Sequence, residues 1–402
     1  MEDSRGRAEA LDASDALADF RDRFVVADPE LIYLDGNSLG RLPRATVERL
    51  ATLVFDGWGR KLIRGWDHWL EMPTAIGDLI GKSLLGARTG EVLVADSTTL
   101  DLYRVVTAAL DARPDRRVIL TDRANFPTDR YVLEGLADAR GLEIRWIDGD
   151  PVQGLDAADV AARLDPDVAV VTFSHVDYRS AAIADVPTIT GLAHAAGALT
   201  VWDLCHSVAA VPVDLTASGA DLAVGCTYKY LNAGPGAPAF LYVRHELQGE
   251  LRNPIQGWFG QRDQFAMAQG YDPEPGIRSW LTGTAPVLGL AAVEEGARLA
   301  ADAGIDPIRA KGIALTEYAI ELHDAWLAPL GCELGSPRDG SRRGAHVSIR
   351  HPDARRLCRE LIASGVVPDF REPDSIRFGL APLYTRFVDV HDGMARLRAL
   401  LT

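Results

Sequence analysis

The stretch GCTYKYLNAGPGAPAFLYV (residues 225–243) is the most informative part of this chain. Lys229 stands between two tyrosines, directly after the apolar run Leu222–Gly225 and before a loop rich in glycine and proline. Burial at a strand end lowers the pKa of a lysine and yields the free amine that reacts with an aldehyde. The segment therefore predicts a reactive lysine, although a surface lysine in a turn would also fit this segment taken alone.

A second segment, VWDLCHS (201–207), places Asp203 at the end of an earlier apolar strand, with His206 shortly after it. A buried carboxylate needs a cationic partner, and a protonated pyridine nitrogen is one. An N-cap of the following turn is the alternative explanation for Asp203. A carboxylate and a lysine at the ends of successive strands together favour binding of pyridoxal 5′-phosphate (PLP), with the carboxylate at the ring nitrogen and the lysine at the aldehyde carbon.

Two segments further upstream fit the rest of such a cofactor. Hydroxyl groups in the run STT (97–99) stand where a helix is expected to begin, and the free N–H groups of a helix N-terminus suit a phosphate. In NFPTD (125–129), Phe126 could stack on a flat ring, and Thr128 and Asp129 could bind its polar substituents. Each segment alone is better explained as an ordinary helix cap or turn.

Between residues 90 and 243, short apolar runs alternate with helical patterns, which predicts a mainly parallel sheet covered by helices on both faces. The last runs lie too close together for a helix between each pair, so an antiparallel strand is expected there. The expected strands are 92–94, 118–121, 144–147, 168–173, 199–202, 222–225 and 239–243, and the expected helices are 100–112, 130–139, 157–164 and 187–196.

The remaining segments predict a smaller α+β domain at the C-terminal end and an N-terminal segment that packs on it. The expected division is 1–45 for that segment, 46–300 for the large domain and 301–402 for the small one. A helix and connector are expected at 1–30, a strand at 30–34, helices at 44–56, 72–85, 305–328, 353–364 and 386–401, and strands near 332–334, 346–350, 366–370 and 375–380. The Trp-rich segment GWGRKLIRGWDHW (57–69) is interpreted as a structured loop that lines a site.

The composition of the chain argues against several classes of partner and location. The 402 residues carry a formal net charge of -15 and no concentration of Lys or Arg, so nucleic acids and anionic membranes are poor partners. No run approaches the roughly 18 apolar residues that span a bilayer, and no signal-peptide pattern is seen at the N-terminus. The four cysteines form no CxxC pair and show no metal-ligand spacing, so we expect reduced thiols, no metal site and a cytoplasmic location.

Six segments, spread over residues 33–384, resemble motifs of the kynureninase family. They are YLDGNSLGRLP (33–43), NFPTDRY (125–131), DLCHSVAAVPVDL (203–215), GCTYKYLNAGPGAPAFLYV (225–243), GWFG (257–260) and IRFGLAPLY (376–384). The family consists of PLP enzymes of fold type I that cleave L-kynurenine to anthranilate and L-alanine. The resemblance implies that fold, that activity and a homodimer. Gly283–Thr284 looks like the bacterial form of the ring-binding segment, which favours kynurenine over its 3-hydroxy derivative.

The resemblance also implies a role for individual residues. Lys229 resembles the Schiff-base lysine, Asp203 the pyridinium partner and Tyr228 a proton donor. Arg377 resembles the arginine that holds the substrate carboxylate, a bidentate task suited to guanidinium. The implied cofactor contacts are Thr98, Thr99, Phe126, Thr128, Asp129, Ser174, Asp203, His206, Tyr228, Lys229, Trp258 and Thr284, and the implied substrate neighbours are Ser38, Trp66, Phe259 and Arg377. The chain departs from the family pattern at Cys205, where a small residue such as Ala is expected, and at Asp101, where Asn is expected.

Other functions remain open at this point. Another fold-type-I enzyme, similar to a cysteine desulfurase or an aminotransferase, would share the lysine and the aspartate. A desulfurase also needs a nucleophilic cysteine on a mobile loop, whereas Cys332 and Cys358 have core or helix positions. A PLP-binding regulator without catalysis would usually carry a DNA-binding domain. A nucleotide-binding protein is disfavoured because no GxGxxG follows the first strand and no GxxxxGK[ST] occurs.

Overall fold

Seven strands form the central sheet of the larger lobe, in the order β2-β8-β7-β6-β5-β3-β4. Their bounds are β2 (Val92–Ala95), β3 (Val118–Asp122), β4 (Glu143–Ile147), β5 (Val168–Ser174), β6 (Leu199–Asp203), β7 (Leu222–Gly225) and β8 (Ala239–Val243). Only β8 runs antiparallel to its neighbours in this sheet; the other pairs are parallel. The predicted mainly parallel α/β fold is confirmed, and so is the antiparallel strand near its end.

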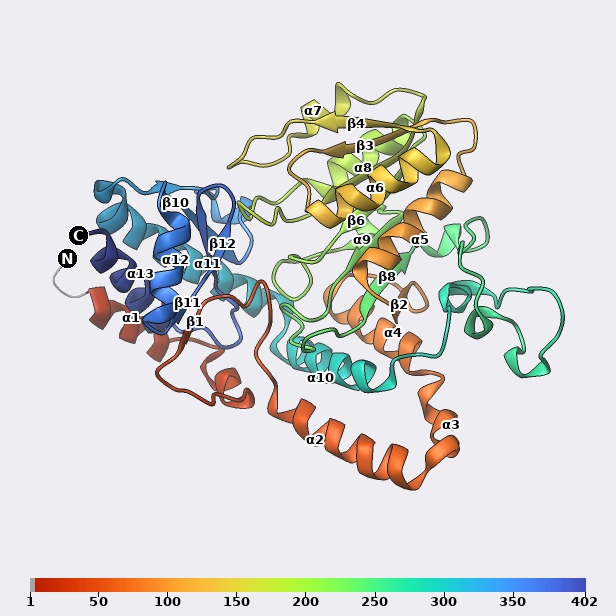
Figure 1. Cartoon of the computed structure of the whole chain (residues 1–402), viewed down its shortest axis with the longest axis horizontal. Helices are drawn as coiled ribbons and strands as arrows, with labels where there is room; N and C mark the ends of the chain where they lie inside the picture. Colours follow the sequence, from red (N-terminus) through yellow and green to blue (C-terminus); the bar gives the residue numbers. More distant parts are fainter. Residues whose placement is uncertain (1–3) are drawn as a thin grey trace.

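The sequence explains this sheet well, because parallel strands covered on both faces read as continuous apolar runs. All but the last residue of β5 are buried, and all of β6 and β7. The helices that flank the sheet (Figure 1) are α4 (Met72–Leu84), α5 (Thr98–Asp111), α6 (Pro127–Arg140), α7 (Ala157–Ala161), α8 (Val186–Ala195) and α9 (Leu215–Ser218). They form one large hydrophobic core with the strands.

The computed structural model describes residues 4–402, and its second lobe is built on a four-stranded sheet in the order β12-β13-β10-β9 (Figure 1). The strands are β9 (Glu333–Leu334), β10 (His346–Arg350), β12 (Asp369–Arg371) and β13 (Ser375–Gly379), and neighbours in this sheet are antiparallel. The helices α11 (Ile305–Leu322), α12 (Ala354–Ala363) and α13 (Phe387–Leu401) pack with this sheet around a separate core. The predicted smaller α+β domain is therefore present.

The N-terminal segment packs on the small lobe. Helix α1 (Ser4–Ala13) contacts α13, a 3₁₀ helix covers Ala18–Arg23, and β1 (Ile32–Tyr33) pairs in parallel with β11 (Val366–Val367). Ala8, Ile32 and Leu34 belong to the hydrophobic core of that lobe. On these contacts we propose the domain division 1–45, 46–300 and 301–402.

Three expectations about local structure were wrong. The segment 57–69 is not a loop: α2 (Arg44–Thr52) continues into a π-helical stretch, Leu53–Arg60, then a 3₁₀ turn and α3 (Trp66–Trp69). The run 366–370 is two short strands in two different sheets, because Pro368 between them has no N–H to continue a ladder. The expected helix 305–328 leaves α geometry after Leu322. In addition, α10 (Val287–Ala303) was not anticipated; it packs on α2 and α4.

Candidate active site

A pocket lies at the carboxyl ends of the parallel strands, where α/β sheets bind their ligands. It brings together side chains from the ends of β5, β6 and β7 and from the N-termini of α5 and α6. Its volume is about 100 Å³, and its lining is Thr98, Thr99, Phe126, Thr128, Asp129, Ser174, Tyr178, Asp203, Cys205, His206, Tyr228 and Lys229. Ten of these twelve are residues that the sequence comparison with the family singled out; Tyr178 and Cys205 are the additions.

Two buried carboxyl groups, Asp129 and Asp203, face each other in this pocket. Burial, followed by the charge of Asp203 and a hydrogen bond with it, holds the pKa of Asp129 well above its ordinary value, so Asp129 carries the shared proton. The backbone N–H of Cys205 donates to Asp203 Oδ1 at 2.6 Å. A positive group in the pocket would complete the environment of these two carboxyl groups.

Lys229 is held by a histidine from the neighbouring strand end. Its Nζ lies 2.9 Å from Nε2 of His206, and burial, followed by the charge of Lys229, holds the pKa of His206 well below its ordinary value. A neutral His206 accepts from Lys229 at Nε2 in the tautomer that carries its proton on Nδ1. Lys229 Nζ also lies 5.9 Å from the ring centre of Phe126. The amine is thus placed beside the aromatic ring that lines the same pocket.

The N-terminus of α5 forms the other end of the pocket. Ser97 is the N-cap, and its hydroxyl accepts from the Leu100 N–H at 3.5 Å. The first helical residues, Thr98 and Thr99, line the pocket, and their backbone N–H groups are donors of a helix start. Ser97 thus caps the helix and the two threonines line the pocket, while phosphate binding by this run stays a prediction. Cys205 Sγ lies 3.9 Å from Thr98 Oγ1.

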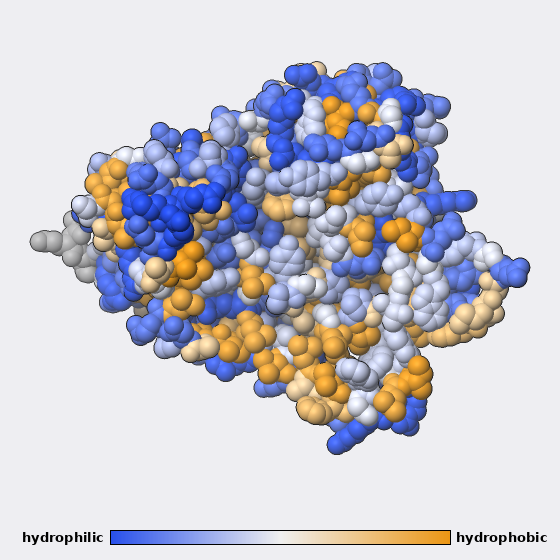
Figure 2. Space-filling model, viewed as in Figure 1, coloured by the Kyte–Doolittle hydropathy of each residue, from blue (hydrophilic) through white to orange (hydrophobic). Residues whose placement is uncertain are grey.

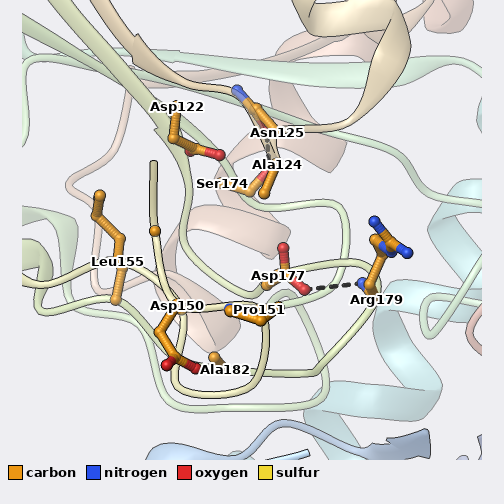
Figure 3. A pocket seen from close by; sticks show the side chains of 13 residues that line it. Asp122, Ala124, Asn125, Asp150, Pro151, Leu155, Ser174, Asp177, Arg179 and Ala182 are labelled. Carbon is orange, nitrogen blue, oxygen red and sulfur yellow. Dashed lines mark hydrogen bonds between the residues drawn. The ribbon is translucent and has the colours of Figure 1, made fainter. Parts of the chain in front are cut away.

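A second cavity of about 100 Å³ lies beside the first (Figure 3). Ser174 belongs to both linings, and its hydroxyl donates to Asn125 Oδ1 at 2.8 Å. Asp122 projects toward this hydrogen-bonded pair, and burial raises its pKa to about 7. Asn125 in turn fixes the turn before Phe126 by accepting from the Phe126 N–H at 2.8 Å. The hydrogen bonds of Asn125 beside this cavity thus hold Ser174 and Phe126 in place at the first pocket.

Arg377 and Ser38, two of the expected substrate neighbours, lie in contact although they come from opposite ends of the chain. Arg377 Nη2 donates to Ser38 Oγ at 3.0 Å, and its Nη1 donates to the carbonyl of Tyr178. Tyr178 also lines the pocket and packs edge-on against Phe126, with ring centres 5.2 Å apart. Tyr178 thereby joins the guanidinium of Arg377 to the pocket that holds Lys229.

Six expected site residues do not line this pocket: Ser38 and Arg377, which reach it through Tyr178, and four others, Trp66, Trp258, Phe259 and Thr284. Trp66 and Phe259 pack edge-on at 5.8 Å, and Trp258 packs on Phe259 at 4.5 Å. Trp66 and Thr284 line a separate, open apolar cavity of about 610 Å³. Thr284 is exposed in that cavity, and Trp258, outside its lining, is 42% exposed.

Among residues 4–402, no cluster of three or more His, Cys, Asp or Glu side chains is placed to hold a metal ion. The four cysteines are free and buried, with Cys332 only 5% and Cys358 only 4% exposed. The helices of the described chain include none with the length and apolar character needed to cross a bilayer.

A family model described as the kynureninase C-terminal domain matches residues 308–397. A kynureninase of Pseudomonas fluorescens is 42% identical over 406 aligned residues, covering 99% of this chain and 95% of the relative. The chain belongs to the kynureninase family. A second member, from Burkholderia pseudomallei, is 43% identical with the same coverage.

Solved structures show how widely this family's fold is shared. A cysteine desulfurase from Thermococcus onnurineus superposes with a TM-score of 0.82 at 20% identity and covers 95% of this chain and 97% of its own. The desulfurase CsdA from Escherichia coli gives a TM-score of 0.81 at 16% identity, covering 96% and 98%. A cystine lyase variant whose structure has glycine covalently linked to PLP gives 0.80 at 16%. At these identities the likeness concerns the fold alone, and it is the fold-type-I architecture expected from the sequence.

Sequence reasoning missed three residues that the structure places at the site. Tyr178 follows β5 and carries no motif of its own. His346, in β10, is fully buried with its ring centre 5.5 Å from that of His206, and both of its ring nitrogens lack a protein partner. Asp369 pairs with Arg377. The one signal available was position, because Asp369 precedes Arg377 by eight residues on a neighbouring strand, and that spacing has meaning only once the hairpin is known.

Proposed function

We propose that this chain is a PLP-dependent kynureninase, which cleaves the Cβ–Cγ bond of L-kynurenine with water to give anthranilate and L-alanine. The observation that carries the proposal is the placement of Lys229 and Asp203 in one pocket, in a chain 42% identical to a kynureninase over nearly its whole length. The reaction class is therefore hydrolysis of a carbon–carbon bond in a ketone.

The pocket has the donor set that PLP requires. The carboxyl group of Asp203 suits the protonated ring nitrogen, and the N-terminus of α5 with Thr98 and Thr99 suits the phosphate. Phe126 would stack on the ring, while Thr128, Asp129, Ser174, His206 and Tyr228 complete the cradle. The closeness of Asp129 and Asp203 supports this arrangement, since a cationic ring would offset the charge of these buried carboxyl groups. When bound, PLP supplies an electrophilic carbon for the substrate amine and accepts electrons from it.

The protein's own groups move the protons. Lys229, once free of the cofactor, is the amine that takes the Cα proton of the substrate, and the neutral His206 beside it orients the Nζ atom. Burial, before any nearby charge, raises the pKa of the Tyr228 phenol, so that Tyr228 stays protonated and can donate. Water balances the reaction: it supplies OH to the acyl carbon and H to the alanine carbon, and the two products then leave.

The substrate is held by its carboxylate and by its aromatic ring. Arg377 and Ser38 present N–H and O–H groups at one place, which suits the α-carboxylate. Trp66 and Phe259 form an aromatic pair that suits the aminophenyl ring. Gly283–Thr284 supports unsubstituted kynurenine over the 3-hydroxy compound as the preferred substrate.

A homodimer is part of the proposal. The segment from α2 to α3 exposes four large apolar side chains, with exposures of 72% for Phe55, 58% for Trp58, 59% for Leu62 and 76% for Ile63. Figure 2 shows hydrophobic surface gathered along the lower edge of the molecule, where Figure 1 places this segment. Exposed apolar patches of this kind mark protein interfaces. A two-fold dimer would cover them and bring Trp258 and Thr284 of one copy toward the cofactor of the other.

The setting of the reaction follows from its chemistry. A kynureninase takes part in tryptophan breakdown, in the kynurenine pathway that also feeds NAD biosynthesis. A cytoplasmic location is supported by the four free cysteines, because such thiols persist in a reducing compartment. Desulfurase or aminotransferase activity is the alternative. It is less favoured because no described cysteine is exposed for nucleophilic attack and the close relatives are kynureninases.

The decisive experiment supplies L-kynurenine and 3-hydroxy-L-kynurenine separately to PLP-loaded protein and follows the fluorescence of the aminobenzoate product. Anthranilate and L-alanine are expected in equal amounts, with faster turnover of L-kynurenine. Cysteine and an amino-acid/keto-acid pair serve as control substrates. Sulfide release or transamination at a higher rate than kynurenine cleavage would overturn the assignment.

A further inference from the structure

The carboxylate site at Arg377 already contains a carboxylate of the protein. Antiparallel pairing of β12 with β13 sets Asp369 directly opposite Arg377, and Asp369 Oδ2 forms an ion pair with Arg377 Nη2. The same oxygen accepts from the Ser38 hydroxyl at 3.1 Å. Asp369 therefore engages both of the side chains that are proposed to hold the substrate.

The N–H groups of Arg377 show how fully it is engaged. Nε donates to the amide oxygen of Asn37 at 3.1 Å, Nη1 donates to the Tyr178 carbonyl, and the two hydrogens of Nη2 go to Ser38 and Asp369. A guanidinium has five N–H groups, so one on Nη1 remains. A substrate carboxylate held by two parallel N–H groups needs a second N–H group besides the free one on Nη1. That second group has to come from Nη2.

Asp369 has an alternative partner at hand. Arg371 Nη2 lies 2.7 Å from the same Oδ2 atom, and the Arg371 side chain is 34% exposed, whereas that of Arg377 is only 1% exposed. If Asp369 leaves Arg377, it keeps this ion pair and remains partly solvated. Release of the buried guanidinium is therefore less costly than it would be for a carboxylate with one partner.

We propose that Asp369 is an internal competitor for the substrate carboxylate: it occupies Arg377 and Ser38 until a ligand with an α-carboxylate displaces it onto Arg371. This inference rests on the proposed function, since it deepens the role of the same site. It makes Asp369 a determinant of specificity, because only a ligand that replaces its charge leaves the buried Arg377 paired. Ligands without a carboxylate leave Asp369 in place and gain nothing from Arg377.

The test compares Asp369→Asn with the wild-type holoenzyme. Removal of the competing charge increases the fraction of protein with Arg377 open, so the KM for L-kynurenine is expected to fall by roughly three- to tenfold with little change in kcat. Asp374→Asn is the matched control, because Asp374 forms an equivalent ion pair with Arg350 (2.9 Å) in the same domain, away from Ser38. It should leave KM unchanged.

A second ligand separates competition from a general effect on the site. Kynuramine, which is kynurenine without its carboxylate, should inhibit wild type and Asp369→Asn with the same inhibition constant. Arg371→Gln, which removes the alternative partner, should raise the KM for L-kynurenine and leave kynuramine inhibition unchanged. An unchanged or increased KM in Asp369→Asn, or an equal gain in kynuramine binding, overturns the proposal. Absence of kynurenine cleavage by the wild type would instead refute the proposed function.

Discussion

Nζ of Lys229 lies 2.9 Å from Nε2 of His206, across the ends of two adjacent parallel strands. This contact orients the amine of Lys229, because a neutral imidazole accepts a hydrogen bond from it without placing a second positive charge beside it. Lys229 is also one of only four lysines in the chain, and of these it alone lines the pocket. Chemical labelling of lysine can therefore identify the cofactor site without ambiguity.

Borohydride reduction of the PLP-loaded protein should fix the pyridoxyl group on Lys229, because reduction traps the bond between a lysine and the cofactor aldehyde. Peptide mapping by mass spectrometry reads the position out. The Lys229→Ala variant should lose both the label and turnover, whereas Lys82→Ala, at an exposed helical position, should keep both. Label on Lys61, Lys82 or Lys311 in place of Lys229 would disprove the assignment.

Ile63→Glu should convert the proposed dimer into a monomer, since it places a charge in an apolar surface that is 76% exposed in the single chain. Sedimentation velocity measures the change. The same variant should bind PLP more weakly, because Trp258 and Thr284 of the second copy are then absent. Tyr131→Glu, at a 63% exposed aromatic on α6, is the control and should change neither property. A monomeric wild-type enzyme with full activity would contradict this prediction.

Arg104→Met should lower the free energy of unfolding by about 3–5 kcal/mol, the usual cost of breaking a buried ion pair. Arg104 is fully buried, pairs with Asp101, contacts Asp96 at 3.1 Å and donates to the Trp280 carbonyl. Urea unfolding measures the loss.

Asp101→Asn should cost only about 1 kcal/mol in the same assay. Burial raises the pKa of Asp101 to about 7, so the neutral side chain is already accessible near neutral pH. A loss as large as that of Arg104→Met would show that the charge of Asp101 is essential. The small expected loss also explains how the chain tolerates Asp at this position.

His175→Gln should reduce the loss of stability in acid. Burial lowers the pKa of His175 from 6.5 to about 4, so the unfolded chain binds a proton there that the folded chain does not. The folded state therefore loses stability as pH falls from 6.5 toward 4. The variant lacks this contribution. Its free energy of unfolding relative to that of the wild type should therefore increase steadily as the pH falls from 6.5 toward 4. Urea titrations at pH 7.5, 6 and 5 test this; a difference that is constant with pH would refute it.

The sheet could be predicted because its strands are short apolar runs, and most of the pocket because Asp203, Lys229 and the STT run each follow such a run. The helical structure of 57–69 could not be, since Gly57, Gly59 and Gly65 disfavour a helix in isolation. Packing explains the outcome: Trp66 and Trp69 stack edge-on at 5.4 Å, and Trp66 also rests on Phe259. The Asp369–Arg377 pair depends on hairpin register, which local pattern does not specify.

The chain between β1 and α2 is hydrogen-bonded to both lobes at once. The Gly379 N–H donates to Leu34 O at 2.6 Å on the small-lobe side, and the Gly40 N–H donates to Tyr228 O at 2.8 Å on the other. A Cβ at Gly40 would lie 2.3 Å from the Lys229 carbonyl, so only glycine fits there. Any hinge rotation of the C-terminal lobe must therefore displace the backbone next to Lys229. Ser38 lies in the connecting segment and would move with it. Binding of the ligand and placement of the amine are therefore mechanically coupled through residues 34–40.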